Sequence, residues 1–172
     1  MATESDFPEI YKEFLRQYGI PHTLRRDNAK SEDSFAVRDI NRDYCVSDAF
    51  TEPHSPWQNP GETNGVRFLK HHAQVLMDRA GAPPSLWFLA HRYVADVYNV
   101  TSHELLKWQT PAQVQGGDTP DISHVLAHYW FDPVLYLDPK TKFPETQEKP
   151  GCFVGFAHNV GDHLTFKYLR KI

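Results

Sequence analysis

The sequence predicts an α/β core followed by a small all-β module, and three observations carry that prediction. The chain has 172 residues, of which 40% are hydrophobic and 23% charged, so its composition is that of a globular protein. Up to about residue 114, apolar side chains recur mainly at helical spacing, with two short strand-like runs between the helices. Beyond 115–124, a segment that contains Gly, Pro and Asp, strand-like runs alternate with turn residues. We therefore expect a core over 1–114, a linker over 115–124 and a β-module over 125–172.

Two helices and two short strands are expected in the first part of the core. Apolar side chains between Phe7 and Tyr18 lie at helical spacing, and Gly19 followed by Pro21 ends that helix. The elements that follow in chain order are a strand at His22–Arg26, a helix at about Ser34–Tyr44 and a strand near Val46–Thr51. A proline-punctuated loop then covers residues 52–60.

Helices are expected in the second part of the core. The first is a long helix with apolar residues at Val66, Leu69, Ala73, Leu76 and Ala80. Gly81 and Pro83 end it. A further helix is expected at about Ser85–Asn99, and a weaker helical stretch at Ser102–Trp108 stops at Thr110-Pro111.

The last part of the chain has the pattern of a small β-barrel or curled sheet. Strand-like runs occur at Val125–Phe131, Val134–Leu137, Cys152–Ala157 and Leu164–Leu169. Alternation is clearest in the last run, where Leu164, Phe166 and Tyr168 alternate with polar residues. We expect the aromatic residues of both halves to pack in the core; these are Trp87, Phe88, Tyr93, Trp108, Tyr129 and Trp130.

Composition excludes several classes of protein. The sequence contains no run of 18 apolar residues, the length that a membrane span needs. The polar, acidic start of the chain resembles no targeting segment. Cys45 and Cys152 lie far apart, so we expect neither a disulfide framework nor a zinc site, and we expect both thiols to be buried. The expected location is intracellular, nuclear or cytoplasmic.

The charge is uneven along the chain. The formal net charge is −4, with twelve acidic and seven basic side chains in residues 1–62, against ten acidic and eleven basic in residues 63–172. A domain whose affinity rests mainly on phosphate contacts carries a strongly basic surface, which this composition does not indicate.

Two carboxylates are candidates for a shared metal site. Asp27 follows the expected strand at His22–Arg26, and Glu62 stands at the start of the long helix, one turn before Val66. Carboxylates from a strand end and a facing helix can converge on a divalent cation, and Mg²⁺ prefers oxygen ligands. Each residue also has an ordinary structural interpretation. Asn59-Pro60-Gly61-Glu62 fits a capped helix start, and Asp27-Asn28 fits a turn.

The sequence motifs around both carboxylates resemble those of a known family. Pro53-His54-Ser55-Pro56-Trp57-Gln58-Asn59-Pro60-Gly61-Glu62 is similar to the loop that precedes the third catalytic carboxylate of copia-type retrotransposon integrases. Leu24-Arg25-Arg26-Asp27-Asn28-Ala29-Lys30 resembles their second-aspartate strand. Leu86-Trp87, Tyr98-Asn99, Thr110-Pro111 and Pro120-Asp121-Ile122-Ser123 resemble later segments, and Phe153-Val154-Gly155-Phe156 resembles the start of their β-module. The resemblance covers nearly the whole chain in the expected order.

The resemblance implies a fold and an activity. It implies the distal half of an RNase H-like integrase core, without its first strands, followed by an SH3-like β-module of a pol polyprotein. In that family an Asp, Asp, Glu triad binds Mg²⁺ or Mn²⁺ for DNA strand transfer, with retroelement ends and target DNA as partners. Asp27 would be the second carboxylate and Glu62 the third. The candidate DNA contacts are Gln58, Asn59, Asn64, Arg67 and Lys70.

The chain departs from the family pattern in one serious respect. No residue matches the first aspartate, because Asp6 lies at a helix start and too close to Asp27. We therefore expect little or no catalysis from this chain alone. We also expect the strand at His22–Arg26 to be an exposed edge that favours self-association or strand borrowing.

Two other interpretations stay open. One is a non-catalytic nucleic-acid-binding or protein-interaction module derived from a retrotransposon. Basic residues such as Arg67 and Lys70 would support it, although they also fit an ordinary solvated face. The other is a decayed fragment without a function.

Overall fold

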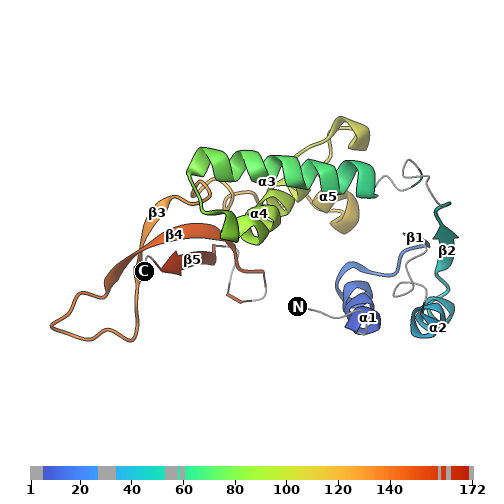
Figure 1. Cartoon of the computed structure of the whole chain (residues 1–172), viewed down its shortest axis with the longest axis horizontal. Helices are drawn as coiled ribbons and strands as arrows, with labels where there is room; N and C mark the ends of the chain where they lie inside the picture. Colours follow the sequence, from blue (N-terminus) through green and yellow to red (C-terminus); the bar gives the residue numbers. More distant parts are fainter. Residues whose placement is uncertain are drawn as a thin grey trace. The chain divides into compact units, whose positions relative to one another are not determined.

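The computed structural model describes residues 6–26, 34–52, 58, 61–158, 160–161 and 164–170, apart from the side chains of residues 62–64. The chain forms two compact units, Met1–Arg67 and Phe68–Ile172. The predicted linker 115–124 lies inside the second unit, and the division into a core and a module stays a prediction. The architecture mixes helices with two small sheets, so the broad α/β class is confirmed (Figure 1).

The first unit begins with the helix that the sequence predicts. The elements are α1 (Phe7–Tyr18), β1 (Thr23–Arg26), α2 (Phe35–Asp43) and β2 (Ser47–Phe50), each within two residues of its predicted bounds. Apolar spacing on the two helices buries Tyr11 and Leu15 of α1 against Val37 and Ile40 of α2. These four residues form the core of the unit, and Leu24 of β1 packs against them.

The two strands of the first unit are parallel. Thr23 pairs with Ser47 and Arg26 with Phe50, and α2 makes the crossover that a parallel pair requires. Within the described residues β1 pairs with β2 only, so its other side is an edge, as the sequence predicts. Self-association through that edge stays a prediction.

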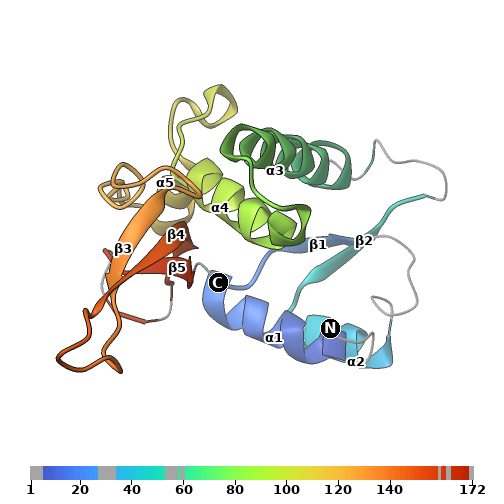
Figure 2. The ribbon, with the colours of Figure 1, turned by 60° about the vertical axis from the view of Figure 1, so that its left-hand side comes forward.

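Helical segments form the end of the first unit and the start of the second. A π-helical turn (Gly61–Val66) leads into α3 (Arg67–Ala80), and a 3₁₀ turn (Pro84–Leu86) leads into α4 (Trp87–Asn99). Both long helices were predicted. Figure 2 shows α3 and α4 side by side. Among the described residues, no helix combines the length and apolarity that crossing a bilayer requires.

The segment after α4 differs from the prediction. Only a 3₁₀ turn at Glu104–Leu106 forms in the predicted helical stretch 102–108, and α5 (Pro111–Gly116) follows where the sequence indicated a break. The Thr110 hydroxyl accepts a 3.0 Å hydrogen bond from the Gln113 amide, and Pro111 occupies the first turn. Thr-Pro is therefore a helix start here, because the threonine caps the helix and proline needs no amide partner there.

The sheet of the second unit is antiparallel, in the order β3-β4-β5. Its strands are β3 (Pro133–Leu137), β4 (Glu148–Phe156) and β5 (Phe166–Arg170). The prediction of a strand at Val125–Phe131 is wrong. That segment is built of turns, in which the Asp132 carboxylate accepts a hydrogen bond from the Tyr129 amide and Phe131 has a φ of +69°. The described residues thus show three strands and leave the SH3-like assignment unconfirmed.

Helices and sheet of the second unit share one apolar core. Trp130, 3% exposed, packs with Ala73 and Met77 of α3 and Ala90 of α4. Tyr93 of α4 reaches the sheet, with its ring centroid 6.0 Å from that of Phe153 and 5.6 Å from that of Phe156. A hydrogen bond also joins the two layers, since His158 Nε2 lies 2.9 Å from Asp96 Oδ2.

The expectation that the aromatic residues are core residues holds only in part. Trp130 is buried and Tyr93 is half-buried, but Trp87, Phe88, Trp108 and Tyr129 are exposed, contrary to the prediction. Helical spacing marks the apolar side of a helix, and it does not separate residues that face the core from those at its margin.

The cysteines also depart from the expectation. Cys45 is exposed, because the chain turns there with a φ of +56°, and Cys152 is half-buried.

Phe153 is 1% exposed and contacts aromatic rings from both layers, so its removal should unfold the second unit preferentially. Phe153→Ala is expected to lower the free energy of unfolding by about 3–5 kcal/mol, the usual cost of an aromatic cavity. Urea unfolding followed by tryptophan fluorescence, to which buried Trp130 contributes, measures it. The control is Leu135→Ala, at a position 71% exposed, for which a change within about 0.5 kcal/mol is expected. Equal effects of the two substitutions would contradict this core.

Candidate functional site

The carboxyl ends of β1 and β2 lie at the same edge of the parallel pair. Arg26 is the last residue of β1, and its partner in the register is Phe50, the last residue of β2. In open α/β sheets, ligands bind outside the carboxyl ends of the strands. Asp27 follows Arg26 directly in the sequence, so this edge is where its segment departs.

Gln58 connects the loop before α3 to this same edge. Its backbone carbonyl accepts a 2.8 Å hydrogen bond from Nη1 of Arg25, in β1. Its side chain contacts Glu52, two residues past β2. The Glu52 amide donates to Gln58 Oε1 at 2.9 Å, and Gln58 Nε2 donates to the Glu52 carboxylate at 3.3 Å. Residue 58 is therefore held at the ends of both strands, three positions before the turn that contains Glu62.

The structure describes the surroundings of the candidate carboxylates, not the carboxylates themselves. Asp27 and Asn59 lie outside the described residues. Only the backbone of Glu62 and Asn64 is described, in the π-helical turn. Among the described residues, no three His, Cys, Asp or Glu side chains gather as a metal site would need. Convergence of Asp27 and Glu62 on one cation stays a prediction.

A buried ion pair lies directly beside the candidate position. The Arg26 side chain is 3% exposed, and its Nη2 lies 2.8 Å from Oδ1 of Asp48 on β2. The guanidinium also lies 4.8 Å from the centroid of the Phe50 ring. A charge buried to this degree needs a partner in a fixed place, so the pair fixes the end of β1.

Two polar side chains from the helices complete this network. Asn41 of α2 donates from Nδ2 to Asp48 Oδ1 at 2.8 Å, and the Tyr11 hydroxyl of α1 donates to Asn41 Oδ1 at 2.8 Å. Burial raises the pKa of the Tyr11 phenol above its ordinary value of 10.0; the Asp48 charge raises it further, and the Arg26 charge opposes the shift. All four elements of the unit thus meet in one chain of polar contacts.

Sequence reasoning missed this network. Two arginines in succession on a four-residue strand must point to opposite sides, so one of them was bound to face the helices. The alternation of side chains along the strand could therefore have predicted a buried arginine.

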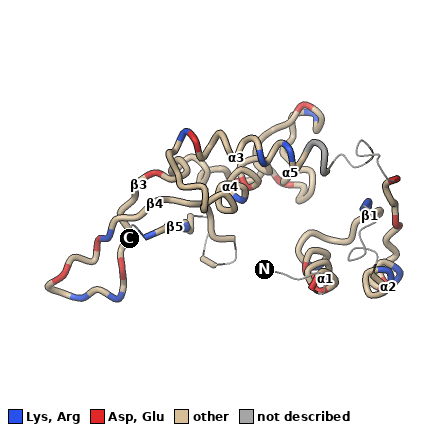
Figure 3. The backbone as a smooth tube through the Cα atoms, viewed as in Figure 1, with Lys and Arg blue, Asp and Glu red and all other residues tan. Residues whose placement is uncertain are grey.

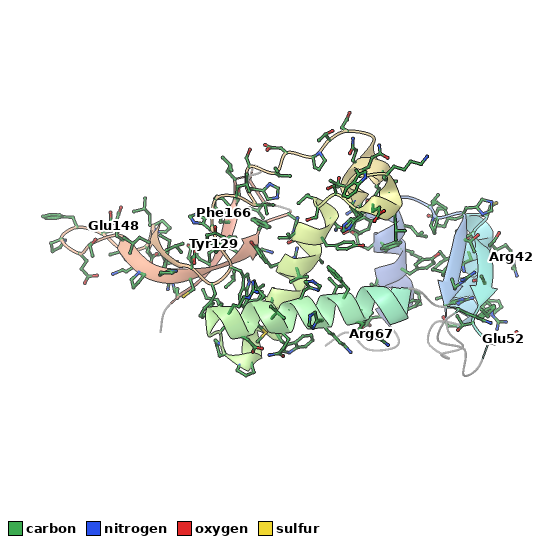
Figure 4. The ribbon with its side chains drawn as sticks, turned by 90° about the horizontal axis from the view of Figure 1, so that it is seen from above. Arg42, Glu52, Arg67, Tyr129, Glu148 and Phe166 are labelled. Atoms are coloured by element: carbon green, nitrogen blue, oxygen red, sulfur yellow. The ribbon has the colours of Figure 1, made fainter. Side chains whose placement is uncertain are left out.

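Two predicted DNA contacts lie on the first turn of α3. Arg67 and Lys70 are exposed, and neither forms an ion pair with the described residues. Figure 3 marks basic residues at the start of α3, and Figure 4 labels Arg67 there. Because Arg67 and Lys70 are three positions apart, they lie on one side of α3. Two exposed cations in this arrangement can contact the phosphate backbone of a nucleic acid.

Comparisons with known proteins give a fold and no family. No protein-family model matches the sequence, and no curated protein matches it. A chain in the cryo-EM structure of the simian T-cell lymphotropic virus intasome, in complex with the PP2A regulatory subunit B56 gamma, is similar in structure. The TM-score is 0.51 at 12% sequence identity, and the match covers 99% of this chain and 63% of that one. This likeness shows a shared fold, and the chain spans less than two thirds of that relative's length.

Asp48→Asn should destabilise the first unit, because it removes the negative charge that lies 2.8 Å from the buried Arg26 guanidinium. We expect a loss of roughly 2–4 kcal/mol in the free energy of unfolding. That is slightly less than for a fully buried pair, because 27% of the Asp48 side chain is exposed. Asp39→Asn is the matched control, since Asp39 pairs with Arg42 at the surface and should change stability by less than about 1 kcal/mol. Equal losses in urea unfolding for the two variants would refute a structural role of the pair.

The Tyr11 phenol gives the first unit a dependence on alkaline pH. Because its pKa is raised on folding, the stability it contributes is complete below pH 10 and is lost as the pH rises through the folded-state pKa. Tyr11→Phe should lower stability at neutral pH and remove this part of the alkaline loss. Urea unfolding followed by the methyl signals of buried Val37 measures the effect in this unit. Tyr44→Phe, at an exposed position, should retain the unaltered pH profile.

Proposed function

We propose that this chain is part of a DNA strand transferase of the integrase type, in which Asp27 and Glu62 are two of the metal-binding carboxylates. The observation that carries the proposal is the 2.8 Å hydrogen bond from Arg25 to the carbonyl of Gln58. It joins the strand that leads into Asp27 to the loop that leads into Glu62. The intasome-related fold supports the same assignment.

The chemistry at this edge fits a divalent cation. Two carboxylates offer the oxygen ligands that Mg²⁺ or Mn²⁺ prefers. Arg26, which could otherwise compete for a carboxylate there, is already paired with Asp48. Asp27 and Glu62 would hold the cation, which would supply Lewis-acid activation of the attacking and leaving oxygens of a phosphodiester. With two of the three family carboxylates, the 172 residues should bind the cation and should not by themselves transfer strands.

The polar residues near Glu62 are proposed to contact DNA. Arg67 and Lys70 would contact phosphates, and Gln58, Asn59 and Asn64 supply amides that can bond to bases or backbone. The copia-type assignment rests on the sequence motifs. One side of β1 has no strand partner among the described residues. As part of the same proposal, another strand would pair with that side and extend the sheet.

A second candidate is a nucleic-acid-binding module without chemistry. The exposed cations of α3 and the exposed aromatic side chains of the second unit favour it. The two candidates differ in one respect, since DNA binding by such a module should be unaffected by removal of divalent cations.

Titration of the 172-residue chain with Mn²⁺, followed by calorimetry, tests the carboxylates. We expect one site, with binding weakened at least tenfold in Asp27→Asn and in Glu62→Gln, because each variant removes a charged ligand. Asp39→Asn, which removes a surface carboxylate from the same unit, should bind as the unaltered chain does. If both Asp27→Asn and Glu62→Gln bind Mn²⁺ with unchanged affinity, the metal-site proposal is refuted.

A further inference from the structure

The sheet of the second unit has one face on which aromatic and basic side chains gather. Residues paired across antiparallel strands place their side chains on the same face. The register puts Tyr136 beside Lys149, Gly151 beside Arg170 and Phe153 beside Tyr168. By strand alternation, all of these lie on one face, and the acidic Glu148 lies on the other. Phe153, at one end of this face, is 1% exposed and contacts Tyr93 of α4, so the accessible part of the face is the end that carries Tyr168 and Arg170.

Two tyrosines on this face are stacked. The ring centroids of Tyr136 and Tyr168 lie 4.1 Å apart with 21° between the planes, although the residues belong to β3 and β5, on either side of β4. Gly151 of β4 makes this possible. A Cβ at that position would lie 3.3 Å from Cδ1 of Tyr136 and 2.7 Å from the Leu169 carbonyl oxygen. The stack therefore forms over a position without a side chain and is part of the folded sheet.

Cations flank the stack. The Arg170 guanidinium lies 5.8 Å from the Tyr136 centroid and 2.6 Å from the Asp138 carboxylate, while 61% of its side chain stays exposed. Lys149 stands opposite Tyr136 and forms no ion pair with the described residues. Asp138 is buried and pairs with Arg170, and Lys149 is the cation beside the rings that has no ion-pair partner among the described residues, so the net charge of these three side chains is positive.

A cavity of about 320 Å³ opens next to the rings. Its walls include Tyr136, Tyr168, His128, Phe153 and Phe166. This volume is at the lower end of the range for ligand sites, and the walls are mostly aromatic. Tyr168 is 43% exposed, so one member of the stack is open to a ligand.

We propose that this face binds unpaired DNA bases, which stack on the Tyr136–Tyr168 pair while Lys149 and Arg170 contact the adjoining phosphates. The choice of DNA rests on the proposed function. Flat rings beside cations match a base joined to a phosphate, because every base has a face that can stack. Duplex DNA fits this face poorly, since its bases are already stacked on each other.

Binding of this kind has a characteristic salt dependence. Two phosphate contacts on a single strand give a slope of log K against log salt of about −1.4, at about −0.7 per contact. Affinity that comes mainly from stacking is also compatible with a chain of net charge −4.

Fluorescence anisotropy with a labelled oligothymidylate of about ten nucleotides tests the proposal, since sites on small folds span about 4–16 nucleotides. Tyr168→Ala should weaken binding by about 5- to 150-fold, the range for loss of one stacking aromatic, and Tyr168→Phe should change it less than about twofold. Tyr44→Ala is the matched control, because Tyr44 is 48% exposed in the first unit. Unchanged binding by a folded Tyr168→Ala variant, verified by Trp130 fluorescence, overturns the proposal.

A second variant keeps the test independent of folding. Lys149→Gln removes a cation without an ion-pair partner among the described residues, and it should make the salt slope shallower by about 0.7. An unchanged slope would count against the phosphate contact. Tighter binding of oligouridylate than of oligothymidylate would overturn the assignment to DNA.

A blunt duplex probe separates this proposal from the proposed function. Duplex binding that Tyr168→Ala leaves intact, together with loss of oligothymidylate binding, supports both. Oligothymidylate binding without metal binding at Asp27 and Glu62 supports the stacking face and refutes the strand-transferase assignment. Metal and duplex binding without oligothymidylate binding supports the strand-transferase assignment and refutes the stacking face.

Discussion

The buried ion pair between Arg26 and Asp48 is the constraint on which the first unit depends. Arg26 occupies the last position of β1, and a guanidinium with 3% of its side chain exposed is stable only if its partner is fixed. Asn41 fixes that partner by donating a 2.8 Å hydrogen bond to Asp48, and Tyr11 holds Asn41 in turn through a second hydrogen bond of 2.8 Å. The network therefore ties both helices to both strands, and it holds the strand end from which Asp27 departs.

Helices and strands with strong local patterns could be predicted from the sequence. The helices at Phe7–Tyr18 and Trp87–Asn99 each carry an apolar stripe; Gly19 ends the first helix, and Pro84 opens the turn that leads into the second. The strand expected at Val125–Phe131 did not form. Its apolar residues serve a turn-rich segment, in which the Phe131 amide bonds to the Phe153 carbonyl at 2.7 Å. Long-range contacts of that kind leave no local pattern, and neither did the Arg26–Asp48 pair.

The candidate site itself stays a prediction, and the structure describes the segments on either side of it. The sequence placed one carboxylate after a strand and the other at a helix start, and the Arg25–Gln58 hydrogen bond now brings those two segments to one sheet edge. What pattern alone could not supply was the second sheet's aromatic face. There Tyr136 and Tyr168 meet across an intervening strand, over a glycine. We thus propose different chemistry for the two units, a carboxylate site in the first and a stacking surface in the second.

The central claim is that the segments carrying Asp27 and Glu62 form one cation site at the end of β1. Paramagnetic broadening of backbone amide signals by substoichiometric Mn²⁺ measures this most directly, because broadening falls steeply with distance from the ion. The amides of Arg26, Gln58 and Gly61 should broaden first, and that of Thr23, at the opposite end of β1, should broaden less. Broadening that begins at other residues, or that is uniform along the chain, would contradict the claim.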